Sequence, residues 1–169
     1  MVLAHCALPL VTLLKFGFAV QSALIMPFAV ASFPLLLEDF RSKKLPNRIL
    51  YPTTITTLIL IFGVALFKSD FHLFAKSIIS ASLSFIGAFS LYLIARGGFG
   101  AGDVKLFLLT GLLLGTFDTP RVVPAAIFSI FGVALYSLFL VITKRATAKT
   151  AVAFGPFIII GTWISIFIL

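Results

Sequence analysis

The sequence predicts an all-α membrane protein, a bundle of about six transmembrane helices joined by short loops. Of its 169 residues, 61% are hydrophobic and only 11% are charged, whereas a soluble domain needs far more polar surface. The apolar residues form long runs, and the charges lie in short clusters between them. A spanning helix needs about 20 apolar residues, so residues 1–169 have room for roughly six spans in a single transmembrane domain.

The net charge of +8 does not indicate nucleic-acid binding, because the cations stand between apolar runs, where they orient a membrane protein. The single cysteine, Cys6, excludes an intramolecular disulfide, and no paired Cys and His spacing predicts a zinc site. We expect a lipid environment and no nucleic acid, metal or cofactor.

The first span is predicted at residues 16–37. Residues 1–15 are too short to cross a bilayer alone, and we expect them to extend the first helix or to lie at the membrane interface. The most charged stretch of the chain, residues 38–48, follows as a loop that contains Asp39.

The second span is predicted at residues 48–67. Pro46 disfavours helix at the residue before it, and Asn47 is a good N-cap candidate, so the helix begins near this point. The third span, residues 74–95, is rich in Ser and Ala, which favour close helix packing in lipid.

Residues 96–107 read RGGFGAGDVKLF and hold four glycines and Asp103. The apolar run at 104–117 is only about 21 Å long at 1.5 Å per residue, less than the roughly 30 Å of a hydrocarbon core. Either this helix is sunk within the bundle, or the glycine loop dips below the membrane surface. Spans at 122–142 and 151–169 complete the six.

Six spans place the loops at 38–48, 96–103 and 143–150 on one side of the membrane, with both chain ends on the other. By the positive-inside rule the loop side is cytoplasmic, so Asp39 and Asp103 face the cytoplasm. The cations on that side are Arg41, Lys43, Lys44, Arg48, Arg96, Lys105, Lys144, Arg145 and Lys149, against Lys15, Lys68, Lys76 and Arg121 on the other.

Asp39 and Asp103 are functional candidates because ionisable groups near lipid are costly and usually face a bundle interior. If they approach each other, repulsion and desolvation make them share one proton. One carboxylate can then take a proton from water while the protonated partner hydrogen-bonds a scissile carbonyl, which is peptide hydrolysis without a metal. Nearby glycines let an extended substrate approach closely.

Three features resemble a known family, the type IV prepilin peptidases. Residues 100–103, GAGD, look like its GxGD signature, and Asp39 with LPN at 45–47 resembles its first catalytic aspartate and the nearby (I/L)PN. FGP at 154–156 resembles a third feature, in the last helix. The resemblance spans about residues 16–165, with the features in the family's order and spacing.

The resemblance implies an aspartic endopeptidase of the bacterial inner membrane, with its active site facing the cytoplasm. Such an enzyme cuts prepilins or pilin-like proteins after the glycine that joins a short basic leader to the apolar pilin helix. Asp39 and Asp103 would be the catalytic pair. The residues expected to bind substrate or to shape the loops are Gly100, Gly102, Pro46, Asn47 and Lys105.

The chain lacks the cytoplasmic insert with paired cysteines that the long form of the family carries. It is therefore similar to the short branch that serves Flp or Tad pili, and the resemblance does not extend to the N-methylation performed by the long forms. The sequence leaves open which pilin is cut and what the oligomeric state is.

Two other functions remain open from the sequence alone. A small transporter or channel could use the two acids for proton or cation coupling, although transporters more often place acids near the bilayer midplane and show repeated halves. A GxGD protease akin to presenilin or signal peptide peptidase would share the mechanism, but its first aspartate usually stands in a Tyr-Asp pair.

Simple structural interpretations also exist for the same residues. Asp103 alone could be a helix N-cap, and Lys105 could be a lysine that extends to the membrane interface. Residues 154–156 could kink the last helix or allow a close helix contact. The basic residues Arg41, Lys43 and Lys44 are interpreted as topology signals.

Overall fold

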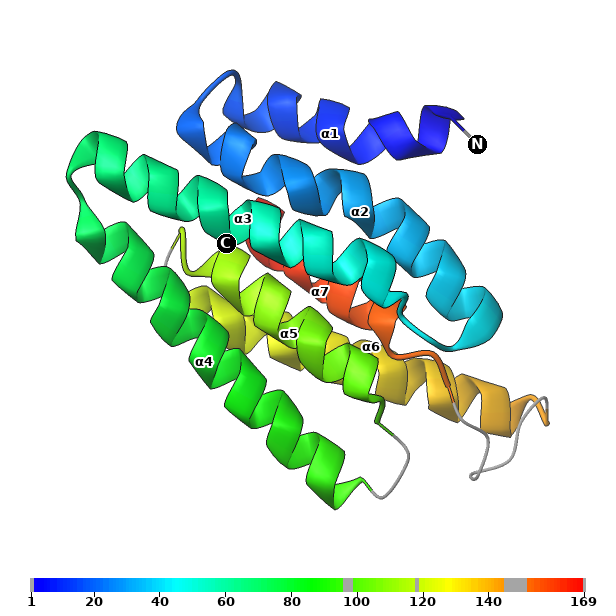
Figure 1. The fold of residues 1–169 in the computed structure, drawn as a ribbon. Helices are drawn as coiled ribbons and strands as arrows, with labels where there is room; N and C mark the ends of the chain where they lie inside the picture. Colours follow the sequence, from blue (N-terminus) through cyan, green and yellow to red (C-terminus); the bar gives the residue numbers. More distant parts are fainter. Residues whose placement is uncertain (1, 96–98, 118, 145–151, 169) are drawn as a thin grey trace.

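The computed structural model describes residues 2–95, 99–117, 119–144 and 152–168, and in these ranges every regular element is a helix (Figure 1). The predicted all-α fold is confirmed. The helices are α1 (Val2–Phe16), α2 (Val20–Ser42), α3 (Asn47–Lys68), α4 (Phe71–Ile94), α5 (Ala101–Leu114), the short 3₁₀ helix η1 (Thr119–Arg121), α6 (Val122–Ile142) and α7 (Gly155–Ile168).

Four helices, α2, α3, α4 and α6, are long and apolar enough to cross a membrane. Helices α5 and α7 have 14 residues each. At 1.5 Å per residue each is about 21 Å long, shorter than a hydrocarbon core. The chain is therefore a multi-pass membrane bundle in which two of the six predicted spans are short helices.

The N-terminal segment was expected to extend the first helix or to lie at the membrane interface, and the structure contradicts the first of these two placements. Helix α1 ends at Phe16, and Gly17 takes a positive φ of 61°, a conformation that glycine adopts without steric cost. The chain then reverses, and α2 packs against α1 (Figure 1). The start of α1 therefore lies at the same end of the bundle as the end of α2, so the two chain ends do not share one side as predicted.

Helix α5 lies in the middle of the bundle and packs against α3, α4 and α7 (Figure 1). It begins three residues earlier and ends three residues earlier than the predicted run at 104–117. Its contact with α4 is close, because a Cβ atom on Gly111 or Gly115 would overlap α4 atoms at Ser84 or Ser77. Of the two explanations for this short run, the structure supports a helix sunk within the bundle.

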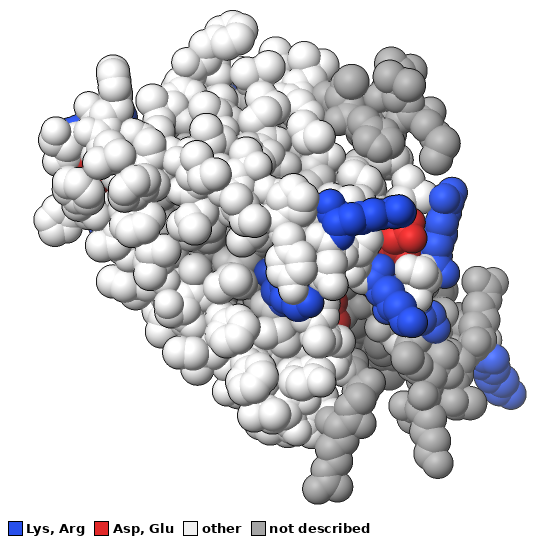
Figure 2. Space-filling view, in the orientation of Figure 1, with Lys and Arg blue, Asp and Glu red and all other residues white. Residues whose placement is uncertain are grey.

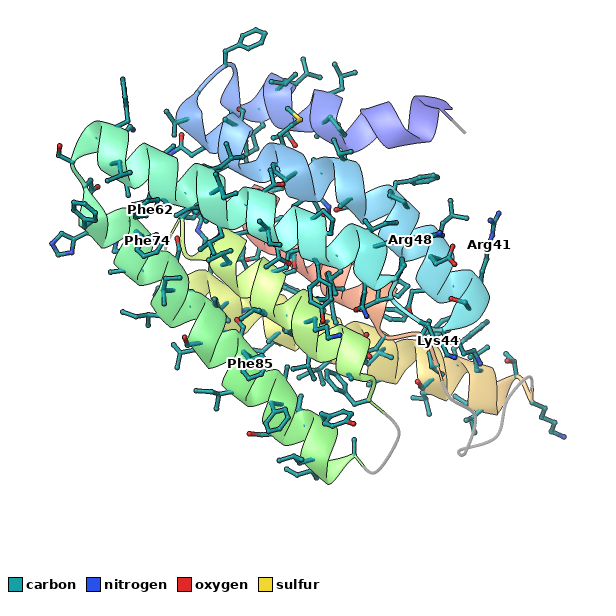
Figure 3. The ribbon with its side chains drawn as sticks, in the orientation of Figure 1. Arg41, Lys44, Arg48, Phe62, Phe74 and Phe85 are labelled. Carbon is teal, nitrogen blue, oxygen red and sulfur yellow. The ribbon has the colours of Figure 1, made fainter. Side chains whose placement is uncertain are left out.

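Charge and apolar surface are separated along the bundle. Large apolar side chains such as Leu93 of α4 and Phe131 of α6 are exposed. Figure 2 shows most of the visible Lys and Arg side chains gathered at one end. Figure 3 places Arg41, Lys44 and Arg48 at this end, where α2 ends and α3 begins.

Arg96, Arg145 and Lys149 lie outside the described residues. The cations described at the opposite end include Lys15, whose Nζ donates hydrogen bonds to the carbonyl oxygens of Ile166 and Phe167 at the end of α7. Cations near a helix C-terminus are favourably placed, so this contact ties α1 to α7.

Candidate active site

Asp39 lies in the last turn of α2 and not in a loop, because the helix continues to Ser42 instead of ending at the predicted residue 37. The helix stops at Lys43, which takes a left-handed conformation with φ 52° and donates its N–H to the carbonyl oxygen of Asp39 at 2.9 Å. The Asp39 side chain points into the bundle and is only 3% exposed.

Asp103 lies in the first turn of α5 and is 8% exposed. The N-cap position belongs to Gly100, so the interpretation of Asp103 as the N-cap is wrong. The N–H groups at the start of a helix have no acceptor within the helix. Asp103 provides one for Gly100, because its Oδ2 accepts a hydrogen bond from the Gly100 N–H at 2.9 Å.

The two aspartates line one cavity of about 270 Å³, which we call the aspartate cavity. It also brings together four of the five residues that the sequence assigned to substrate binding or loop shape. Its walls are Asp39, Lys43, Lys44, Leu45, Asn47, Gly100, Ala101, Gly102, Asp103 and Lys105. Two of these, Lys43 and Lys44, had been interpreted only as topology signals.

Pro46 is the fifth predicted residue, and it does not line the aspartate cavity. It occupies the N-cap position of α3 without a side-chain cap, so the prediction that Asn47 is the N-cap is wrong. The Asn47 side chain instead accepts a hydrogen bond from Lys105 Nζ at 3.0 Å. The same Nζ lies 4.9 Å from the centre of the Tyr51 ring.

The structure adds two contacts to the interpretation of Lys105 as a lysine that extends to the membrane interface. Its ammonium group connects α5 to α3 beside the aspartate cavity, through a hydrogen bond and a cation-π contact. The glycine signature also packs tightly here, because a Cβ atom on Gly102 would lie 3.1 Å from Leu45 Cβ. The segment between α2 and α3 is thereby held against the start of α5.

Helix α7 supplies a contact that sequence reasoning did not predict. The Gly155 N–H donates a hydrogen bond to Asp39 Oδ2 at 3.0 Å, and both residues are buried. The FGP segment begins α7, so the interpretation as a kink within the last helix is wrong, whereas a close contact is present. The FGP motif itself was visible in the sequence. The sequence could not show which acceptor the Gly155 backbone N–H would contact.

Burial raises the pKa of Asp103 from its ordinary value of 3.8 to about 7. The hydrogen bond from Gly100 acts in the opposite direction, and the charge of Asp39 adds to the increase. Asp103 lies outside the four helices that are long enough to cross a membrane. A carboxyl group with this pKa can donate a proton near neutral pH, as a general acid must.

Two buried carboxyl groups in one cavity, beside a glycine-containing helix start, are the arrangement expected for acid–base hydrolysis. The sequence profile of the type IV leader peptidase family matches residues 26–143, which include both aspartates. The chain belongs to this family.

Curated relatives support the family at modest identity. A "Prepilin leader peptidase/N-methyltransferase" of Pseudomonas putida is 27% identical over 170 residues, covering 95% of this chain and 55% of the relative. A protein of the same name from Bacillus subtilis (strain 168) is 26% identical over 149 residues, covering 88% of this chain and 57% of the relative. The chain thus spans about half the length of these relatives. No solved structure matches it.

Proposed function

We propose that this leader-peptidase family member is a membrane aspartic endopeptidase that removes the short basic leader from type IV prepilins or pilin-like proteins. The observation that carries the proposal is the aspartate cavity, which is lined by two buried carboxyl groups from different helices. Membership of the type IV leader peptidase family supports the substrate class. The bond cut is the one after the glycine that precedes the apolar pilin helix.

In the proposed reaction Asp39 is ionised and Asp103 is protonated. Asp39 takes a proton from water as the water oxygen attacks the scissile carbonyl carbon, and Asp103 gives its proton to the carbonyl oxygen. In the second step Asp39 protonates the amide nitrogen, the C–N bond breaks, and Asp103 recovers a proton from the diol. The products are a new carboxyl group and a new amine, and both aspartates return to their starting forms.

The proposed location is the bacterial inner membrane, with the aspartate cavity facing the cytoplasm. The support is the cluster of Arg41, Lys44 and Arg48 at the cavity end of the bundle, which the positive-inside rule assigns to the cytoplasm (Figure 3). A prepilin reaches this side because its basic leader stays in the cytoplasm while its apolar helix enters the bilayer. We propose the peptidase activity alone, without the N-methyltransferase activity named in the two relatives.

The test is cleavage of a prepilin-like substrate by isosteric variants in a purified, membrane-reconstituted protein. Asp39→Asn and Asp103→Asn should each abolish cleavage, because each leaves the pair without its acid or its base. Asp70→Asn is the matched control, since Asp70 caps α4 at the opposite end of the bundle through a 3.0 Å hydrogen bond from the His72 N–H.

Substantial cleavage by either cavity variant would refute the dyad. Proton or cation flux through wild-type vesicles without any cleavage would favour the transporter alternative.

A further inference from the structure

Two Phe-Gly pairs flank the aspartate cavity, one at 99–100 and one at 154–155. In each pair the glycine N–H donates to an aspartate Oδ2: Gly100 to Asp103 at 2.9 Å and Gly155 to Asp39 at 3.0 Å. The pairs lie before α5 and at the start of α7, far apart in the chain. Each catalytic candidate therefore receives one backbone donor from an equivalent dipeptide.

The phenylalanines of the two pairs touch each other. The rings of Phe99 and Phe154 meet edge to face, with centroids 5.0 Å apart and an interplanar angle of 68°. Phe107 lies beside both, with centroid distances of 6.2 Å to Phe99 and 6.3 Å to Phe154. Aromatic rings at these separations attract each other, so the cluster joins the start of α7 to the start of α5.

A side chain at the second position of the 154–155 pair would crowd the Asp39 carboxyl group. A Cβ atom on Gly155 would lie 2.8 Å from Asp39 Oδ2 and 3.2 Å from Leu45 Cδ2. The next residue, Pro156, has no N–H to offer, so Gly155 provides the donor that α7 turns toward Asp39.

Asp39 needs an external donor because of its own position. It lies in the last turn of α2, where the negative end of the helix dipole opposes a negative charge. The positive end of α7, with the Gly155 N–H, compensates for this. Among the described residues, the other charged groups that line the aspartate cavity are Lys43 and Lys44 after α2, and Asp103 and Lys105 on α5.

From this geometry we infer that the two Phe-Gly pairs act together as a clamp that orients both carboxylates, with Gly155 as the positioning residue that lets Asp39 ionise in a buried place. The inference rests on the proposed function and explains how the reactive geometry is maintained. The clamp leaves Oδ1 of each aspartate as the atom available to water and to the scissile carbonyl.

The first experiment is Gly155→Ala in the full-length protein reconstituted in lipid nanodiscs, with kcat and KM measured on a prepilin-like substrate from about pH 5 to about pH 9. Displacing the Asp39 carboxylate should lower kcat by roughly 100-fold with little change in KM. The acidic limb of the kcat profile should move to higher pH, since the ionised carboxylate loses its donor.

Two glycine variants serve as controls. Gly161→Ala introduces a Cβ atom on the same helix, 2.6 Å from the Ala125 carbonyl oxygen, and should weaken helix packing without moving the pH profile. Gly63→Ala should change neither the helix packing nor the pH profile, because nothing lies within 4 Å of the added Cβ atom. If Gly155→Ala keeps the wild-type profile, or loses activity only as Gly161→Ala does, the clamp is refuted.

A milder pair of variants tests the aromatic half and covers the case in which Gly155→Ala does not fold. Phe154→Leu should lower kcat and shift the profile in the same direction. Phe157→Leu should have neither effect, because the Phe157 ring packs against Tyr136, with ring centroids 5.5 Å apart. Equal effects of the two would refute the clamp while leaving the dyad intact. Absence of cleavage by the wild-type protein would overturn the proposed function and the clamp with it.

Discussion

Raising the pH above neutrality should remove the activity by ionising Asp103. Burial raises the pKa of this residue to about 7, so its protonated form is present below that pH and is lost as the pH rises through it. With a pKa of about 7, about half of the molecules carry the proton at pH 7 and about one tenth at pH 8. The cleavage rate should therefore fall about fivefold between these pH values and about tenfold for each pH unit beyond.

The assay is kcat at saturating prepilin-like substrate, measured with the reconstituted protein over the neutral and alkaline range. Asp70→Asn should reproduce the wild-type profile, because Asp70 lies at the start of α4, away from the aspartate cavity. A rate that stays constant from pH 7 to about pH 9 would refute the assignment of Asp103 as the acid.

A direct titration separates the two carboxyl groups. In Asp39→Asn the charge that helps to raise the pKa of Asp103 is gone, so the pKa of Asp103 should fall. Infrared spectra of protein with labelled aspartate carboxyl groups can measure the decrease without any activity. An unchanged or increased pKa of Asp103 would contradict the proposed coupling of the pair.

Two further pairs of substitutions test the packing of α5 and the contacts of Lys105. Gly111→Ala should destabilise the protein by about 1–3 kcal/mol, because its Cβ atom would overlap α4, whereas Gly87→Ala meets nothing within 4 Å. Thermal unfolding in detergent should separate them, and equal stabilities would contradict the close α4–α5 packing. Lys105→Met and Asn47→Ala should each weaken substrate turnover by similar factors that do not multiply in the double variant, since each removes the same hydrogen bond. Independent, multiplying effects would refute that shared role.

The fold class and the site's location were predictable from the sequence because both depend on local patterns. Long apolar runs form membrane helices whatever their neighbours are, so the apolar runs of this chain were enough to predict an all-α bundle. The clustering of cations at one set of helix ends indicated that Asp39 and Asp103 lie at the same end. The GAGD and LPN segments then indicated the family, which the profile match shows.

Helix ends were less predictable, because they depend on single backbone conformations. The reversal at Gly17 and the stop at Lys43 each rest on one residue with positive φ. Either residue could also have continued a helix in a different tertiary setting. For this reason the separate helix α1 and the helical position of Asp39 were missed.

Only the tertiary structure decided how the site is assembled. Gly155, whose N–H is the donor, and Asp39, whose Oδ2 is the acceptor, lie 116 positions apart in the chain. Because almost every residue has a backbone N–H, the sequence does not show which acceptor a particular one will contact. The contact of Phe99 with Phe154 likewise exists only because α5 and α7 pack together. Composition and local pattern thus determined a membrane bundle with Asp39 and Asp103 at one end, whereas helix packing decided which backbone groups hold these two acids.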